Sequence, residues 1–150
     1  MHQKVANTYQ QANLFTANPI RLIIMCYDGA IGSLRLARQY YLAKDYEAKA
    51  KALQKAMDII HELNGSLDME KGGAIAANLR SLYLYMIQIL MEGDIKKDVT
   101  MFSEVIRMLE ELESAWKEIA HAQVTEERPA AYPFPAAGVR QCAASQAWSV

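Results

Sequence analysis

The residues of this chain most able to do chemistry are histidines, carboxylates and one cysteine at short spacing. His61-Glu62 begins like the zinc-protease pattern HExxH, but the position of the second histidine is Gly65, so the second metal ligand is absent. Cys26 has no adjacent His or Lys that would activate a thiol, and a small buried side chain is the expected role. Neither a zinc protease nor a cysteine enzyme is indicated.

Two further pairs have the carboxylate-x-x-His spacing of di-iron helical bundles, Asp58 with His61 and Glu118 with His121. Such a centre also needs an inward carboxylate from each of two more helices. The candidates for those positions fall outside the main apolar stripes, so we expect solvated histidines. The sequence therefore predicts a protein that is not an enzyme and binds neither metal nor cofactor.

The balance of charged residues and the distribution of apolar residues restrict the kinds of partner and compartment that we expect. Lys+Arg number 16 and Asp+Glu 17, which gives a net charge of -1 and no basic field for nucleic acid. The first residues lack the apolar stretch of a secretory signal, and the run 82–91 is too short to span a bilayer. Two distant cysteines do not suggest a disulfide framework. We expect a cytoplasmic protein without stable membrane insertion.

Four segments show the apolar periodicity of helices that face a bundle. The first runs from Asn18 to about residue 43, and the second from residue 46 to about 64, with Asp45 as its cap. A third is expected between a reversal at 72–73 and Gly93, with Ile75, Leu79, Leu82, Met86 and Ile89 facing the core. A fourth follows, capped by Asp94. Short connections imply an all-α fold, an antiparallel four-helix bundle.

The two ends of the chain differ from this middle part. Residues 2–12 carry only a thin apolar stripe that includes Val5 and Tyr9, and so predict a short N-terminal helical cap. After Gln123, prolines and small residues indicate a flexible C-terminal tail. The expected organisation is a cap over 1–17, the bundle over 18–122 and a probable tail over 123–150.

The first and third helices are more apolar than a single core face requires. Each of the two helices has a second apolar stripe beside its core stripe. In the first helix this second stripe is Leu22, Met25, Cys26, Gly29, Leu36 and Tyr40, and in the third it is Ala76, Tyr83, Leu84, Ile87 and Leu90. One explanation is that both helices are central and bury both stripes. The other is a groove that accepts an amphipathic helix and is covered by the N-terminal segment when empty.

The order of several short motifs resembles the FliS family of flagellar secretion chaperones, from residue 7 to residue 119. The motifs are Tyr9-Gln10-Gln11, Thr16-Ala17-Asn18-Pro19, Leu22-Ile23-Ile24-Met25-Cys26-Tyr27-Asp28-Gly29-Ala30, Ile59-Ile60-His61-Glu62-Leu63, Lys71-Gly72-Gly73-Ala74-Ile75-Ala76, Leu82-Tyr83 and Ala115-Trp116-Lys117-Glu118-Ile119. Cys26 stands where an aliphatic residue is usual, and the tail has no counterpart.

The resemblance implies a type III export chaperone that binds the disordered C-terminal segment of flagellin, prevents its premature polymerisation and delivers it to the export gate. Val5 and Tyr9 would form the N-terminal cap and take part in docking to the export gate protein. The expected flagellin-binding groove is lined by Leu22, Cys26, Gly29, Ala76, Leu79, Tyr83 and Met86. A helical adaptor for a folded partner and a di-iron bundle enzyme are the alternatives, and a homodimer is left open.

Overall fold

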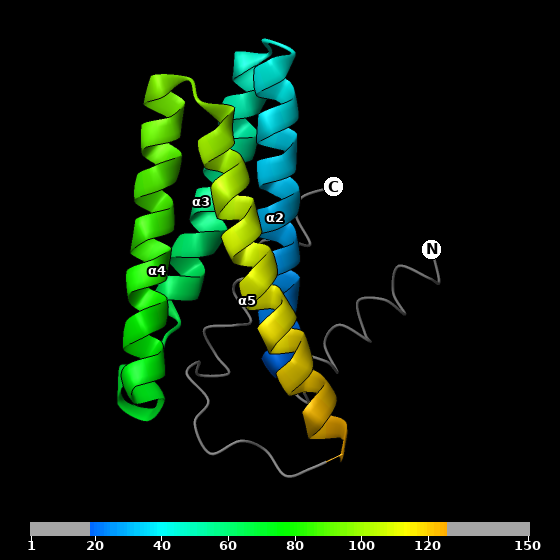
Figure 1. The fold of residues 1–150 in the computed structure, drawn as a ribbon, viewed down its shortest axis with the longest axis vertical. Helices are drawn as coiled ribbons and strands as arrows, with labels where there is room; N and C mark the ends of the chain where they lie inside the picture. Colours follow the sequence, from blue (N-terminus) through cyan, green and yellow to red (C-terminus); the bar gives the residue numbers. More distant parts are fainter. Residues whose placement is uncertain (1–18, 126–150) are drawn as a thin grey trace, which may run out of the picture.

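The computed structural model describes residues 19–125, which form four long helices. They are α2 (Pro19–Leu42), α3 (Tyr46–Gly65), α4 (Met69–Lys96) and α5 (Val99–Thr125). Successive helices run in opposite directions and are joined by short turns (Figure 1). The antiparallel four-helix bundle predicted from the sequence is confirmed. The predicted N-terminal cap and most of the C-terminal tail lie outside the described residues.

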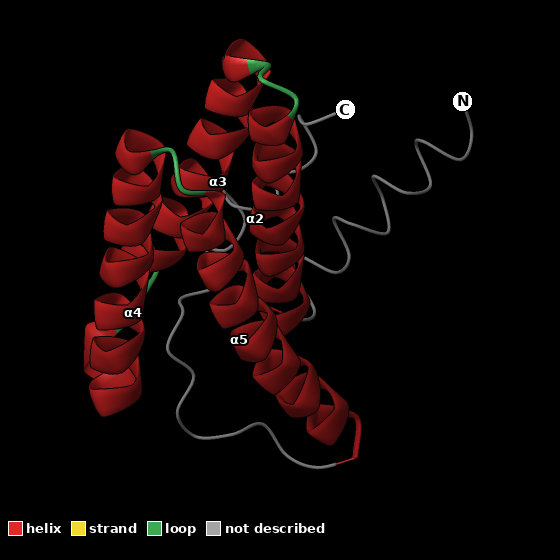
Figure 2. Ribbon diagram, turned by 45° about the horizontal axis from the view of Figure 1, so that its top comes forward, coloured by secondary structure: helices red, strands yellow, loops and turns green. Residues whose placement is uncertain are grey.

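The helices are arranged so that each packs on two neighbours. α2 packs closely on α3 and α5, and α4 completes the bundle by packing on the same two helices. α4 therefore stands diagonally opposite α2, and Figures 1 and 2 show it set apart from the other three over much of its length. The two helices predicted to carry spare apolar stripes are this diagonal pair.

Side-chain caps begin α3 and α4. Asp45 accepts a hydrogen bond from the Ala48 amide at 3.2 Å, as the sequence predicts, and Asp68 accepts from the amides of Glu70 and Lys71. Such caps satisfy amides that have no partner within the helix.

The predicted start of the last helix was wrong. Asp94 lies inside α4, which continues to Lys96, and Asp98 instead accepts a hydrogen bond from the Thr100 amide at 3.0 Å. Gly93 does not end α4. A Cβ there would come within 2.9 Å of the Met101 side chain, so its glycine permits α4 and α5 to approach closely.

The predicted chain reversal at 72–73 was also wrong, because α4 already begins at Met69. Gly73 has φ 51° and ψ -128°, a conformation that only glycine adopts readily, and it kinks the first turns of α4. The connection to α3 is made by residues 66–68. The sequence correctly marked this position as one of unusual backbone conformation, but Gly73 bends α4 instead of reversing the chain.

The core is continuous through the bundle. On α2 the apolar periodicity predicts an inward stripe of seven residues, of which six are buried and Tyr41 is partly buried; the buried ones are Ile20, Ile23, Tyr27, Ala30, Leu34 and Ala37. The core also includes Leu22, Cys26 and Ile31 of α2. Fully burying a side chain of leucine size stabilises a fold by about 1.5–3 kcal/mol. In α4 the buried positions are Gly72, Ala76, Leu79, Tyr83, Met86, Ile89, Leu90 and Gly93. Ile75, expected in the core, is 51% exposed.

Candidate functional site

The residues predicted to line the groove lie in the interior of the bundle. Leu22, Cys26, Ala76, Tyr83 and Met86 have no exposed surface and Leu79 has 6%, while Gly29 is half-buried. They belong to α2 and α4, the diagonal pair. The structure therefore places these groove residues on the inner sides of the two helices, whereas Leu36 and Leu84 of the predicted second stripes are exposed.

A hydrogen-bonded group of aromatic side chains joins three helices at this position. The hydroxyls of Tyr27 on α2 and Tyr83 on α4 lie 2.5 Å apart, and Trp116 Nε1 on α5 donates to Tyr27 Oη at 3.3 Å. Burial raises the pKa of Tyr27 to about 12 and also raises that of Tyr83. Both hydroxyls are therefore uncharged at neutral pH and hold α4 against α2 without an ion pair.

Cys26 differs from its expected state. It is disulfide-bonded in the structure, so the expectation of a reduced small side chain was wrong. Cys142, the other cysteine of the chain, lies outside the described residues. The buried position expected for Cys26 is nonetheless found.

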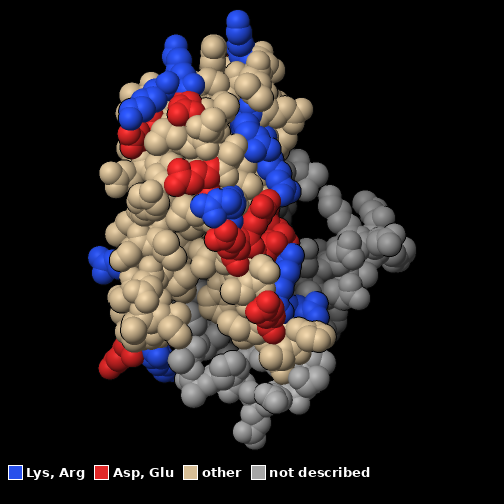
Figure 3. All heavy atoms as spheres, viewed as in Figure 1, with Lys and Arg blue, Asp and Glu red and all other residues tan. Residues whose placement is uncertain are grey.

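The surface of α4 is the most apolar part of the described chain, and sequence reasoning had identified little of it. Its exposed large apolar side chains are Met69, Ile75, Leu84, Tyr85, Met91 and Ile95. Of these residues, only Leu84 was assigned to a second stripe. Met91 and Ile95 lie on the same helical face as Leu84, so their spacing could have revealed them as well. Figure 3 shows few charged side chains over this helix.

α4 is also long and apolar enough, by length and composition, to cross a membrane. The apolar window that meets this test is 33% buried within the bundle. Its apolar residues are thus divided between a core-facing side, which packs on α3 and α5, and the outer side just described. A core helix of a bundle can pass such a test because it is apolar on more than one face.

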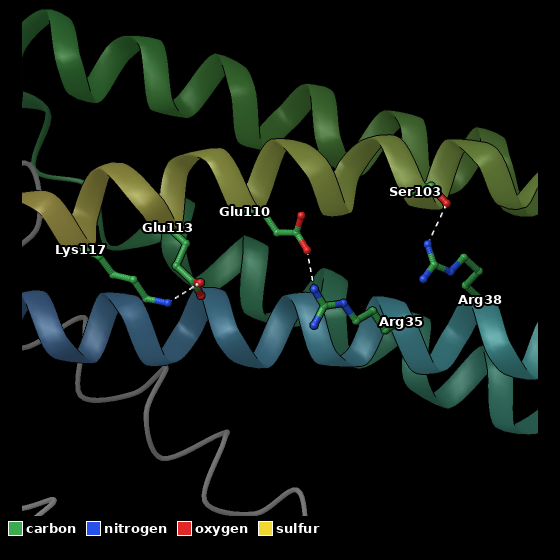
Figure 4. A network of polar contacts seen from close by, with 6 residues as sticks. All are labelled: Arg35, Arg38, Ser103, Glu110, Glu113 and Lys117. Atoms are coloured by element: carbon green, nitrogen blue, oxygen red, sulfur yellow. Dashed lines mark hydrogen bonds and ion pairs between the residues drawn. The ribbon is translucent and has the colours of Figure 1, made fainter.

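The seam between α2 and α5 is polar in contrast. Arg35 pairs with Glu110, and Arg38 donates to Ser103 Oγ at 3.0 Å (Figure 4). Lys117 Nζ lies 2.9 Å from Glu113, a carboxylate that is only 12% exposed. The contacts of Arg35 and Arg38 join α2 to α5, and the Lys117–Glu113 pair lies within α5. This seam is therefore not an apolar docking surface.

Burial raises the pKa of Glu113, and the nearby Asp28 carboxylate on α2 raises it further, while Lys117 opposes the shift. Glu113 is a carboxylate held beside another carboxylate in a partly dry seam. Within residues 19–125, however, no three His, Cys, Asp or Glu side chains are grouped so that they could hold a metal ion.

The two pairs with di-iron spacing do not converge. Asp58, His61, Glu118 and His121 are all exposed on the surfaces of α3 and α5. Their side chains therefore do not turn into the bundle, where a di-iron centre would require them. The described geometry provides apolar surface and helix packing, not a catalytic constellation.

A protein-family model described as flagellar protein FliS matches residues 1–123. The chain belongs to the FliS family. The FliS match covers all four helices and ends two residues before the end of α5. Val5 and Tyr9 fall within the matched range but outside the described residues. The prolines and small residues after residue 123 lie beyond it.

Curated FliS relatives agree with this assignment. The chain is 40% identical to the flagellar secretion chaperone FliS of Salmonella typhimurium over 73% of its own length and 82% of the relative. It is 37% identical to the flagellar secretion chaperone FliSB of Pseudomonas aeruginosa, over 79% and 97%. For the FliS chaperone of Bacillus subtilis the identity is 34%, over 81% and 90%. These relatives are named as chaperones, and no catalytic family is indicated.

Proposed function

We propose that this FliS-family protein is a flagellin-specific export chaperone of the cytoplasm. It binds the disordered C-terminal segment of flagellin, prevents premature polymerisation and delivers the segment to the flagellar export gate. The observation that carries the proposal is the set of relatives named flagellar secretion chaperones, matched over most of both chains. The surplus of apolar surface on α2 and α4 supplies the physical means.

In this proposal the flagellin segment forms a helix between α2 and α4 and contacts the predicted groove residues. Six of the seven are buried, so the segment reaches them only by displacing what lies over them. Val5 and Tyr9 provide a displaceable cover in the free protein. Exchange of one apolar covering for another keeps the net free energy of binding moderate.

The diagonal arrangement favours such an exchange. α2 and α4 meet through the Tyr27–Tyr83 hydroxyl contact, and α4 otherwise packs on α3 and α5. A client that separates α4 from α2 thus leaves the closely packed α2–α3 and α2–α5 pairs intact. Ordering a segment that folds on binding costs about 2–5 kcal/mol of the interaction free energy. The resulting moderate affinity helps later release without a nucleotide.

The test uses the one groove residue that is partly accessible. Gly29→Glu places a charge in the proposed groove, and we expect at least a tenfold loss of affinity for a flagellin C-terminal peptide in calorimetry. Gly32→Glu is the matched control, because Gly32 is also a half-buried glycine of α2 and an added Cβ there meets no atom within 4 Å.

The melting temperatures of both variants establish that the bundle is intact. Equal affinities for Gly29→Glu and Gly32→Glu would show that the segment binds elsewhere. Absence of any binding by the unmodified chain would overturn the proposed function itself.

A further inference from the structure

Cys26 of α2 is one of the residues expected to line the flagellin-binding groove, and its sulfur is disulfide-bonded in the structure. The chain contains two cysteines, so Cys142 is the partner that a single chain can supply. A bridge between these two sulfurs fixes part of the C-terminal segment at the groove.

The chain after α5 is long enough to close this bridge. α2 begins and α5 ends at the same end of the bundle (Figure 1). Trp116 of α5 lies level with the neighbour of Cys26, because its indole donates to the Tyr27 hydroxyl at 3.3 Å. From Trp116 to Thr125 the helix rises by about 14 Å. Cys142 follows Thr125 by 17 residues, which span up to about 56 Å when extended. The bridge can therefore close without unwinding α5.

Burial along the Cys26 face of α2 is uneven. Leu22 and Cys26 are fully buried, whereas Leu36 of the same stripe is 47% exposed. The covered part of this face is thus the part nearest the start of α2, where the sulfur of Cys26 is bonded. Two alanines directly follow Cys142, and such small apolar residues suit a covered position.

A disulfide at Cys26 excludes a client helix from the same level of α2. The bond holds the two Cα atoms about 4.4–6.8 Å apart, whereas the axes of two packed helices lie about 8–10 Å apart. The residues beside Cys142 therefore occupy the surface that a client helix needs.

We propose that a reversible disulfide between Cys26 and Cys142 holds the C-terminal segment in the groove and blocks the groove under oxidising conditions. This inference rests on the proposed function, because it assigns a regulation to the same site. Disulfides of cytoplasmic proteins are usually transient or redox-sensing, so in the proposed chaperone the bridge is a switch and not a permanent link. Reduction releases the segment and opens the groove to flagellin.

The redox step is a thiol–disulfide exchange with a small disulfide as the oxidant. One cysteine thiolate attacks glutathione disulfide, forms a mixed disulfide and releases one glutathione thiolate. The thiolate of the other cysteine then attacks the bonded protein sulfur and displaces the second glutathione. The two cysteines lose two electrons and two protons, and glutathione disulfide becomes two glutathione thiols. Excess thiol reverses both steps.

Peptide mapping of the full-length chain without reductant, after oxidation with glutathione disulfide, tests the bridge itself. Cleavage after arginine and lysine gives one peptide of residues 22–35 and another of residues 141–150. We expect these two peptides to be joined, while the chain remains a single species of 16.9 kDa. A phosphine reductant should separate them.

Calorimetry with a flagellin C-terminal peptide tests the block. The oxidised chain should bind the peptide at least tenfold more weakly than the reduced chain. Cys142→Ser is the matched control, because it leaves the four helices unchanged and cannot form the bridge. Its affinity should equal that of the reduced chain under both conditions, and its melting temperature establishes that the bundle is intact.

Several results would overturn the proposal. They are the absence of the joined peptides, pairing of cysteines between two chains, and equal affinities of the oxidised and reduced chains. A loss of affinity in oxidised Cys142→Ser would also overturn it, since modification of Cys26 alone would then block the groove. If the reduced chain did not bind the peptide, the proposed function would fail and the block with it, while the peptide map would still decide whether the bridge exists.

Discussion

Glu113 makes the α2–α5 seam sensitive to pH. Its raised pKa means that the folded chain binds this proton more tightly than the unfolded chain does. The stability contributed by protonation is complete below about pH 4.5, the ordinary value for this group, and is lost as pH rises through the raised value.

Glu113→Gln removes this titration, so its unfolding free energy relative to the unmodified chain should increase as the pH rises from 4 to 7. Urea unfolding at several pH values measures this difference. Asp28→Asn should reduce this pH dependence, because the Asp28 carboxylate is one of the causes of the raised pKa of Glu113. A difference that does not vary with pH would contradict the assignment.

At the residue level, the sequence could predict which side chains are apolar but not which of two adjacent stripes faces inward. Tyr83 and Ala76 were assigned to a spare stripe and Ile75 to the core of α4, yet Tyr83 and Ala76 are buried and Ile75 is half exposed. The choice depends on long-range contacts such as the Tyr27–Tyr83 hydroxyl pair. No local pattern encodes that pairing, although both tyrosines were visible as apolar positions.

The kink in α4 depends on one glycine. Gly73→Ala should lower the free energy of unfolding by about 1–3 kcal/mol, because a Cβ is strained at φ 51° and ψ -128°. Gly65→Ala is the control at another helical glycine, where an added Cβ meets no atom within 4 Å and φ is not positive. It should be neutral or stabilise the fold by up to about 1 kcal/mol.

Urea unfolding of both variants at one pH gives the comparison. If Gly73→Ala were as stable as Gly65→Ala, the kink would be absent in solution.

Helix starts were predictable where a capping side chain precedes an apolar stripe, as at Asp45, or where a proline can occupy the first helical position, as at Pro19. They were missed where a glycine could either end a helix or serve packing within one. Gly93 was interpreted as an end, but it lies at the close approach of α4 and α5. A left-handed Lys97, with φ 57°, ends α4 instead, and lysine is not a residue type that signals such a position.

For the whole molecule, the proposed cover predicts how the chain responds to truncation. Deleting residues 1–12 should leave the bundle folded, because helices α2 to α5 contain the continuous core. Affinity for the flagellin segment should not fall, since Val5 and Tyr9 compete with the client in the proposal. Calorimetry and thermal melting measure the two effects.

Val5→Ser combined with Tyr9→Ser is the matched variant and should behave like the deletion. A large fall in melting temperature for either protein would show that the N-terminal segment is structural and not a displaceable cover.

The hydroxyl contact between Tyr27 and Tyr83 holds α4 against α2 without any charged group. Because neither hydroxyl ionises near neutral pH, and because neutral partners are not screened by salt, ordinary changes of pH or ionic strength do not loosen it. In the proposed function, the contact opens when an apolar client segment compensates for the separation of α4 from α2. The proposal therefore implies a chaperone that responds to the identity of its client and not to the ionic state of the surrounding solution.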